Sequence, residues 1–215
     1  MFDYTYIAIE GNIGAGKTTL AKFLSNAFES SLLLEEFSEN KFLKEFYKTG
    51  EYALHAEIQF LLDRSKQLNQ FFQSNQSLII SDYFPSKSLI FSQMNLSQKE
   101  FSIIKDLSAN LFKGIPKPQI LLFIDRNIDD VMNNIHKRGR SYEKKMNYNY
   151  IEKLAEGYEL WLEKLSIPVI RIDANSISLD KPDILKESFY KLLSMSHMST
   201  QRKIKIDSIL SSETI

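Results

Sequence analysis

The chain has 215 residues, with 27 basic and 27 acidic side chains and therefore a formal net charge of zero. This length suits one α/β domain with a sizeable core, and the balanced charge gives no reason to expect nucleic acid as a partner. Cysteine is absent from the sequence, which excludes disulfides, thiolate catalysis and cysteine-ligated zinc.

The sequence offers no segment for entering or crossing a membrane. No apolar stretch approaches the ~20 residues of a transmembrane helix. The first predicted strand starts within about five residues of Met1, which leaves no room for a signal peptide. We therefore expect a cytoplasmic protein without a membrane partner.

A strand, a glycine-rich loop and a helix are predicted at the start of the chain. The apolar run at residues 6–9 is typical of a strand buried on both faces, and a helical apolar pattern covers residues 16–29. The loop between them reads G-x-x-x-x-G-K-[ST], whose glycines let backbone N–H groups approach a polyphosphate. The pattern predicts a nucleoside-triphosphate site formed by Gly11, Asn12, Ile13, Gly14, Ala15, Gly16, Lys17, Thr18 and Thr19.

Two side chains of this loop have distinct expected roles. Lys17 supplies positive charge for the outer phosphates, and the Thr18 hydroxyl can ligate the Mg²⁺ that accompanies them. The helix that starts near Gly16 adds the positive end of its dipole to the same place.

Short apolar strands and amphipathic helices alternate along the rest of the chain. Further strands are predicted at residues 32–34, 77–81, 120–124 and 169–172, and helices at residues 40–47, 52–72, 86–93, 98–112, 128–137, 148–165 and 183–193. This order predicts a doubly wound α/β fold of the P-loop NTPase type, with about five parallel strands and helices on both faces. We expect one domain over residues 1–197, followed by a polar tail over residues 198–215 that is frayed or forms a short appended element.

Acidic residues follow several predicted strands, at the sheet edge where such folds bind ligands. The strand-end acids are Glu10, Glu35, Glu36, Asp82, Asp125 and Asp173. Asp82 is placed to hold Mg²⁺ directly or through water, and otherwise caps the next helix. We favour Glu36 as the acceptor of a proton from a substrate hydroxyl, although a solvated loop acid is the alternative for it and for Glu35. Asp125 opens a helix-capping run and is assigned to capping.

Arg138, Gly139 and Arg140 lie between two predicted helices. A glycine between two arginines predicts a lid, at about residues 136–147, that closes over phosphates and stabilises charge in the transition state. A basic helix C-terminus that complements its own dipole is the alternative. The phosphate loop in the same chain favours the lid.

The order of these segments resembles the deoxyribonucleoside kinases of the deoxycytidine, deoxyguanosine and deoxyadenosine kinase type, in their bacterial form. The resemblance covers residues 6–193 approximately. Its carriers are IEGNIGAGKTTLA at 9–21, LLLEEFSENKFLKEFY at 32–47, AEIQFLLDR at 56–64, SDYFPSKSLIF at 81–91, IHKRGRSYE at 135–143 and YIEKLAEGYELWL at 150–162.

The resemblance implies transfer of the γ-phosphoryl group of Mg²⁺-ATP to the 5′-hydroxyl of a deoxyribonucleoside. Glu36 would act as the base, while Lys17, Arg138 and Arg140 would stabilise charge. The residues implied to contact the nucleoside are Glu36, Tyr47, Glu57, Arg64, Asp82 and Glu143, and those implied to handle the metal are Thr18 and Asp82. Family members are commonly homodimers, so we expect a homodimer here.

Within the nucleoside site, the resemblance gives two pairs separate tasks. Glu57 and Arg64 match residues on the base side, and they share one face of a helix because seven residues are nearly two turns. Tyr47 and Glu143 match the pair that holds the 3′-hydroxyl. Asp82 matches the acid of the family's [DE]-R-S motif.

Several positions depart from the family pattern. Tyr83 stands where the arginine of that motif belongs, and Lys87 is either its replacement or a surface lysine. Glu57 is a carboxylate where many members have glutamine, which would favour bases that present N–H donors. Asn134 stands where animal relatives have a further arginine.

Other functions were weighed against this interpretation. A nucleoside-monophosphate kinase of the thymidylate kinase type shares the fold, loop and lid, but its phosphate acceptor calls for arginine where Glu36 is expected. A regulatory GTPase would need D-x-x-G and N-K-x-D motifs, which the sequence lacks. A non-catalytic nucleoside-binding protein stays open because of Tyr83.

Overall fold

A six-stranded parallel sheet is the centre of the fold in this computed structural model, which describes residues 2–36, 40–74, 77–140, 143, 146–195 and 203–210. Its strands are β1 (Tyr6–Gly11), β2 (Ser31–Leu33), β3 (Ile79–Ser81), β4 (Ile120–Asp125), β5 (Val169–Asp173) and β6 (Lys203–Ile204). They lie in the order β2-β3-β1-β4-β5-β6, and every neighbouring pair is parallel. The predicted doubly wound fold is confirmed, with one strand more than the sequence indicated.

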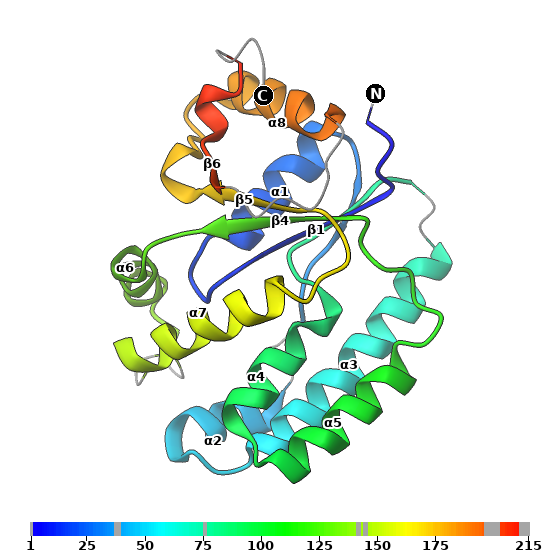
Figure 1. The fold of residues 1–215 in the computed structure, drawn as a ribbon, viewed down its shortest axis with the longest axis vertical. Coiled ribbons are helices and arrows are strands. Elements are labelled where there is room, and N and C mark those ends of the chain that lie inside the picture. Colours follow the sequence, from blue (N-terminus) through cyan, green and yellow to red (C-terminus); the bar gives the residue numbers. More distant parts are fainter. Residues whose placement is uncertain are drawn as a thin grey trace.

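Helices cover both faces of this sheet. The helices are α1 (Lys17–Ala27), α2 (Lys41–Thr49), α3 (Ala53–Ser74), α4 (Ser88–Asn95), α5 (Gln98–Leu111), α6 (Ile128–Arg138), α7 (Tyr148–Leu162) and α8 (Pro182–Ser194), with short 3₁₀ turns η1 (Pro85–Lys87), η3 (Ala174–Ser176) and η4 (Ile206–Ser208). Figure 1 shows α1 and α8 on one side of the sheet and α3, α4, α5 and α7 on the other. None of the described helices combines the length and apolarity needed to cross a membrane.

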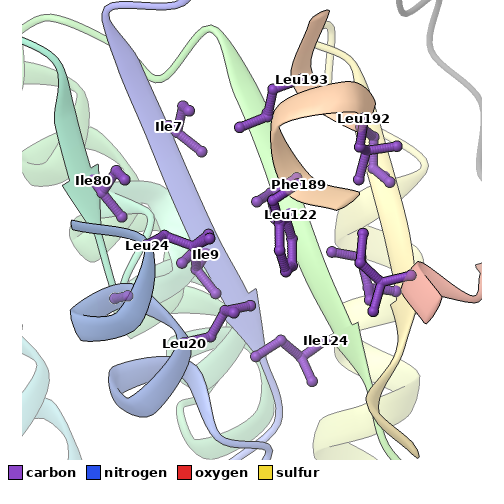
Figure 2. Close-up of a cluster of buried hydrophobic side chains, with 14 of the residues drawn as sticks. Ile7, Ile9, Leu20, Leu24, Ile80, Leu122, Ile124, Phe189, Leu192 and Leu193 are labelled. Atoms are coloured by element: carbon purple, nitrogen blue, oxygen red, sulfur yellow. The ribbon is translucent and has the colours of Figure 1, made fainter. Parts of the chain in front are cut away.

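The core on one face joins the sheet to α1 and α8. In Figure 2, side chains of β1 and β4 meet those of the two helices; the labelled residues are Ile7, Ile9, Leu20, Leu24, Ile80, Leu122, Ile124, Phe189, Leu192 and Leu193. On the other face, Ala8 and Leu121 pack with residues of α4 and α7 such as Ile90 and Leu154. Because both faces are covered, all six residues of β1 are buried, which explains its continuous apolar run.

The part of the polar tail that the structure describes adds to the sheet. β6 pairs with β5, and Ile206 and Ile209 are almost completely buried in the core beside α8. The Ile206 N–H donates a hydrogen bond of 2.9 Å to Ser176 Oγ. Residues 203–210 therefore form the appended element, while residues 198–202 and 211–215 lie outside the described residues.

Helix ends follow the local sequence. The predicted helix at 86–93 is divided into η1 and α4 because Pro85 starts a 3₁₀ turn. Ser97 and Glu100 form a capping box at α5, as their spacing predicted. Asn127 caps α6, whereas Asp125 pairs with Arg171 at 3.0 Å and makes no cap, contrary to the prediction.

Candidate active site

The loop between β1 and α1 is shaped to surround a polyphosphate. Gly14 and Gly16 have φ angles of 82° and 108°, in the left-handed region that favours glycine. A Cβ at Gly14 would lie 2.9 Å from the carbonyl oxygen of Val131, so the loop packs closely against α6. α1 starts at Lys17, directly after the loop, so its unpaired N–H groups are available to an anion.

Two side chains without a predicted role contact this loop from α6 and from the end of β4. Asn134 Nδ2 donates to the carbonyl oxygen of Gly14 at 2.9 Å, and Arg126 Nε donates to that of Ala15 at 3.1 Å. Asn134 therefore supports the loop from the position where animal relatives have an arginine. Spacing alone offered no signal for either contact, because both partners are backbone carbonyls far away in the sequence.

The Lys17 side chain folds onto the backbone of its own loop. Its Nζ donates to the carbonyl oxygens of Gly11 at 2.9 Å and Asn12 at 3.1 Å. Burial, together with the nearby charge of Lys87, lowers the pKa of Lys17 to about 8. The Lys17 ammonium is therefore mostly charged at neutral pH. An anionic ligand bound next to it would stabilise this charge.

A pocket opens beside the loop at the carboxyl ends of β1, β2 and β3. Its charged lining consists of Lys17, Glu35, Glu57, Arg64, Asp82, Lys87, Arg138, Arg140 and Glu143. Its apolar and aromatic lining includes Leu43, Phe46, Tyr47, Phe60, Phe91, Tyr150 and Tyr158. Aromatic walls with a few convergent polar groups are typical of a small-molecule site.

Asp82 connects the phosphate loop with the segment after β2. Its carboxylate accepts a hydrogen bond from the Thr18 hydroxyl, and it accepts another from the backbone N–H of Glu35 at 2.7 Å. The two predicted metal-handling residues are thus in contact. Oxygen ligands of this kind suit Mg²⁺, which commonly takes one or two protein ligands and completes its shell with phosphates and water. Among the described residues, no group of three His, Cys, Asp or Glu could hold a metal ion alone.

The neighbouring glutamates after β2 lie in different surroundings. Glu36 is exposed and does not line the pocket. Glu35 lines it and pairs with Lys87 Nζ at 2.6 Å and with the guanidinium of Arg64. The place predicted for Glu36 is therefore occupied by Glu35, since Glu35 lines the pocket and Glu36 does not.

The ion pairs of Glu35 determine its charge. Burial alone would raise the pKa of this carboxyl, but Lys87 and Arg64 together lower it to about 2. Glu35 is therefore a carboxylate throughout the neutral range. Because it carries no proton there, it can accept a hydrogen bond from a substrate hydroxyl.

Lys87 provides a positive charge beside Glu35, which the uncharged Tyr83 does not. Tyr83 is fully buried, and its hydroxyl donates to Gln67 Oε1 at 2.9 Å. Lys87 is only 4% exposed, so it is not a surface lysine. Its Nζ lies 5.8 Å from the centre of the Tyr83 ring and in contact with Glu35. The structure thus supplies a cation beside Glu35 from one turn further along the chain.

Arg64 lies on the inner face of α3. Its guanidinium donates to Ser88 Oγ of α4 and to Glu35, and its Cζ lies 4.7 Å from the centre of the Phe60 ring. Its Nε is buried and has no hydrogen-bond partner among the described residues. Arg64 therefore connects the predicted base side of the pocket to Glu35.

Glu57 lies two turns before Arg64 on the same helix and also lines the pocket. It is 7% exposed and accepts a hydrogen bond of 3.0 Å from Ser92 Oγ of α4. Burial raises its pKa to about 7, with Arg64 and the Ser92 hydroxyl acting in the opposite direction. The serines at positions 88 and 92 thus each contact one member of the Arg64–Glu57 pair, which the sequence did not indicate.

The lid arginines meet an acid of their own segment. Arg138 Nη2 lies 2.8 Å from Glu143 Oε1, and Arg140 Nη1 lies 3.3 Å from the same oxygen. Glu143 is 4% exposed. The sequence assigned the arginines to phosphates and Glu143 to the sugar, whereas here they pair with one another. The predicted lid includes residues 141–142 and 144–145, which lie outside the described residues.

Tyr47 of α2 lines the same pocket as Glu143. Its ring centre lies 6.2 Å from that of Tyr150 at the start of α7, and burial raises the pKa of its hydroxyl. The pocket therefore brings together the phosphate-loop side chains Lys17 and Thr18 with all but one of the side chains predicted outside that loop. Glu36 is the exception.

Known proteins resemble this chain both in sequence and in fold. A family model described as deoxynucleoside kinase matches residues 7–195. The deoxyguanosine kinase of Bacillus subtilis is 35% identical over 181 residues, which cover 80% of this chain and 87% of that protein. The deoxyadenosine/deoxycytidine kinase of the same organism is 26% identical, with 77% and 81% covered. A structure of deoxyadenosine kinase from M. mycoides with bound dATP superposes with a TM-score of 0.75 at 25% identity, over 86% of this chain and 99% of that one.

Proposed function

Because the chain belongs to the deoxynucleoside kinase family, we propose an assignment of its pocket residues to the steps of an ATP-dependent phosphoryl transfer. The acceptor deoxynucleoside occupies the pocket with its 5′-hydroxyl at Glu35, and the triphosphate of ATP lies in the loop at residues 11–19. The hydroxyl oxygen attacks the γ-phosphorus, ADP leaves, and the hydroxyl proton passes to the Glu35 carboxylate.

One observation carries this assignment: Glu35 is a carboxylate held by two cations in the same pocket as Lys17 and Thr18. Phosphoryl transfer depends mainly on positioning and on stabilising charge, so a base of low pKa suffices when it orients the hydroxyl and takes the proton late. Lys87 and Arg64 fix the carboxylate for that task. The sequence-based choice of Glu36 is replaced by Glu35 on this ground.

Lys17, Arg138 and Arg140 are proposed to stabilise the charge of the transferring group. Both arginines are paired with Glu143, so their action on a phosphate requires them to exchange that partner or to share it. Thr18 and Asp82 are proposed to hold Mg²⁺, which supplies charge neutralisation at the β- and γ-phosphates when bound. The contact between these two side chains supports that role.

Glu57 is proposed to favour deoxyguanosine over deoxyadenosine. Guanine presents two N–H donors side by side on its pairing edge, which one ionised carboxylate can accept together, whereas adenine presents an acceptor beside its amino group. Glu57 lies buried in the pocket near Arg64, and the deoxyguanosine kinase of Bacillus subtilis is a relative. Tyr47 and Glu143 would hold the 3′-hydroxyl at the other end.

A homodimer formed through α4 and α7 is proposed as the assembly. A groove along these helices is lined by Leu89, Met94, Phe101, Leu160 and Trp161, with lysines and one glutamate among its borders. Leu160 is 54% exposed, and Gly157 lets α4 approach α7, since a Cβ there would lie 2.8 Å from Ile90 Cγ2. Substituting lysine for Leu160 should give a monomer by light scattering; an unchanged dimer would place the interface elsewhere.

A cytoplasmic location stays a prediction from the sequence.

The function is tested by offering ATP and Mg²⁺ with each of the four deoxynucleosides and, separately, with their monophosphates. We expect turnover of deoxynucleosides, fastest with deoxyguanosine, and loss of turnover in Glu35→Gln. The family match favours this outcome over the thymidylate kinase type of activity. Turnover of monophosphates alone would refute the hydroxyl acceptor, and an unaffected Glu35→Gln variant would refute the assigned base.

A further inference from the structure

Glu10, the acid near the end of β1, has no part in the scheme above, although it lies next to the site. Its side chain is completely inaccessible to solvent. Taking a carboxylate out of water is unfavourable unless hydrogen bonds and a cation compensate it. Its partners therefore indicate what holds it there.

The carboxylate of Glu10 joins three segments of the chain. Oε1 accepts a hydrogen bond of 2.7 Å from the backbone N–H of Phe84, in the loop after β3. Oε2 accepts one of 3.2 Å from the N–H of Gly11 and one of 3.1 Å from the hydroxyl of Tyr158 on α7. The phosphate loop, the β3 loop and the helix after the lid thus meet at one side chain.

The fourth partner of the Glu10 carboxylate is the ammonium group of Lys87. Lys87 Nζ lies 3.6 Å from Glu10 Oε1 and 2.6 Å from Glu35 Oε2. The ammonium therefore lies between two acids, one behind it in the core and one facing the pocket. The N–H of Phe84, three residues before Lys87, is bound by the same Glu10 oxygen, so both ends of this turn are anchored to β1.

The charges around Lys87 explain why an acid is needed behind it. Arg64 opposes the charge of Lys87, and Lys87 in turn lowers the pKa of Lys17. Burial lowers the pKa of Lys87, but the charge of Glu10 and the charge and hydrogen bond of Glu35 raise it. The other ionisable groups near this cluster are Asp82, Tyr83 and Tyr158.

We propose that Glu10 is a positioning residue for phosphoryl transfer, which fixes the Lys87 ammonium against Glu35 and anchors the turn that carries it. This inference rests on the proposed role of Glu35. Tyr83 stands where the [DE]-R-S motif has its arginine, and one of the two cations beside Glu35 is instead a flexible lysine. Glu10 restricts that lysine to one position.

The test is a double-mutant cycle on kcat, measured with saturating ATP and deoxynucleoside for the wild type, Glu10→Gln, Lys87→Met and the double variant. If Glu10 acts through Lys87, Glu10→Gln lowers kcat by about 10-fold or more, with smaller changes in both KM values, and has no further effect once Lys87 is methionine. Losses that multiply in the double variant would overturn the proposal. Glu159→Gln, a half-exposed acid on α7 that pairs with Arg171, is the matched control and should be unchanged.

A pH profile adds a readout that a purely structural role would not move. Without Glu10, Lys87 loses its proton at lower pH, so the alkaline limb of kcat should move to lower pH in Glu10→Gln. The shift should disappear in Glu10→Gln/Lys87→Arg, because arginine does not titrate in this range. A shift of equal size with arginine present would assign the effect to Lys17 and contradict the proposal.

The cycle remains informative if Glu10→Gln alone folds poorly. The double variant removes the charges of Glu10 and Lys87 together, so neither is left buried without its partner. Once thermal melting has shown that the double variant and Lys87→Met are both folded, their kcat values are compared. Equal kcat values support the proposal and a lower value for the double variant refutes it. Failure of the proposed function would be recognised separately, by full activity of Glu35→Gln.

Discussion

Glu57 offers a prediction whose magnitude follows from its burial. A rise in the pKa of this carboxyl from an ordinary 4.5 to about 7 corresponds to about 3 kcal/mol against its ionised form in the folded protein. Below pH 4.5 the carboxyl is neutral in both folded and unfolded chains. Between pH 4.5 and 7 only the unfolded chain ionises, so the free energy of unfolding falls as pH rises, and above 7 the full penalty is present.

Glu57→Gln removes this penalty. We expect the variant to gain up to about 3 kcal/mol relative to wild type at pH 8.5 and almost nothing at pH 4.5, measured by urea denaturation at both pH values. Glu36→Gln, an exposed acid nearby in the chain, is the control and should show no such difference. Equal effects of Glu57→Gln at the two pH values would refute the claim that its burial makes ionisation unfavourable.

The same titration should be visible in base preference. As Glu57 ionises above pH 7, the ratio of kcat/KM for deoxyguanosine to that for deoxyadenosine should rise in the wild type and stay flat in Glu57→Gln. A pH-dependent ratio in both proteins would place the discriminating group elsewhere in the pocket.

Three further predictions concern the phosphate loop and the tail. Because burial lowers the pKa of Lys17 to about 8, ADP affinity by calorimetry should fall between pH 7 and 9 as the ammonium loses its proton; constant affinity would contradict this. Gly14→Ala should destabilise by about 1–3 kcal/mol and weaken ADP binding, since it adds strain at positive φ and a clash with the Val131 carbonyl. Gly114→Ala is the control: its φ is also positive, but an added Cβ there would contact no other atom. It should lower stability less than Gly14→Ala and leave ADP binding unchanged. Equal effects of the two substitutions would show that the clash with Val131 is unimportant. Ile206→Ala should cost about 2–5 kcal/mol by urea denaturation, and a loss below about 0.5 kcal/mol would show that the tail is not part of the core.

The sequence was most informative where the chemistry is local. The spacing of Gly11, Gly16 and Lys17 defined the phosphate loop because the loop's geometry depends on consecutive residues. The strands at 6–9 and 120–124 were visible because a sheet covered on both faces needs continuous apolar runs. The sixth strand was missed because β6 is only two residues long, whereas the i, i+3 spacing of Ile206 and Ile209 matches the turn η4 that follows it.

Side-chain direction was harder to predict than position. Glu35 and Glu36 are adjacent in the chain, yet one side chain lines the pocket and the other is exposed to solvent. The placement of Lys87 depended on a 3₁₀ turn started by Pro85, which no periodicity revealed. The pairing of Glu143 with Arg138 and Arg140 was not predicted, because their spacing in the sequence does not show where these side chains meet. These contacts join groups by tertiary packing, so a single sequence carries little signal for them.

The most direct test of the central claim compares two adjacent acids in a single turnover. With enzyme in excess over ATP and saturating deoxynucleoside, the rate of γ-phosphoryl transfer is measured by rapid quench for Glu35→Gln and Glu36→Gln. We expect a loss of about 10²- to 10⁴-fold for Glu35→Gln and a rate within about twofold of wild type for Glu36→Gln. A large loss in Glu36→Gln with Glu35→Gln unaffected would contradict it.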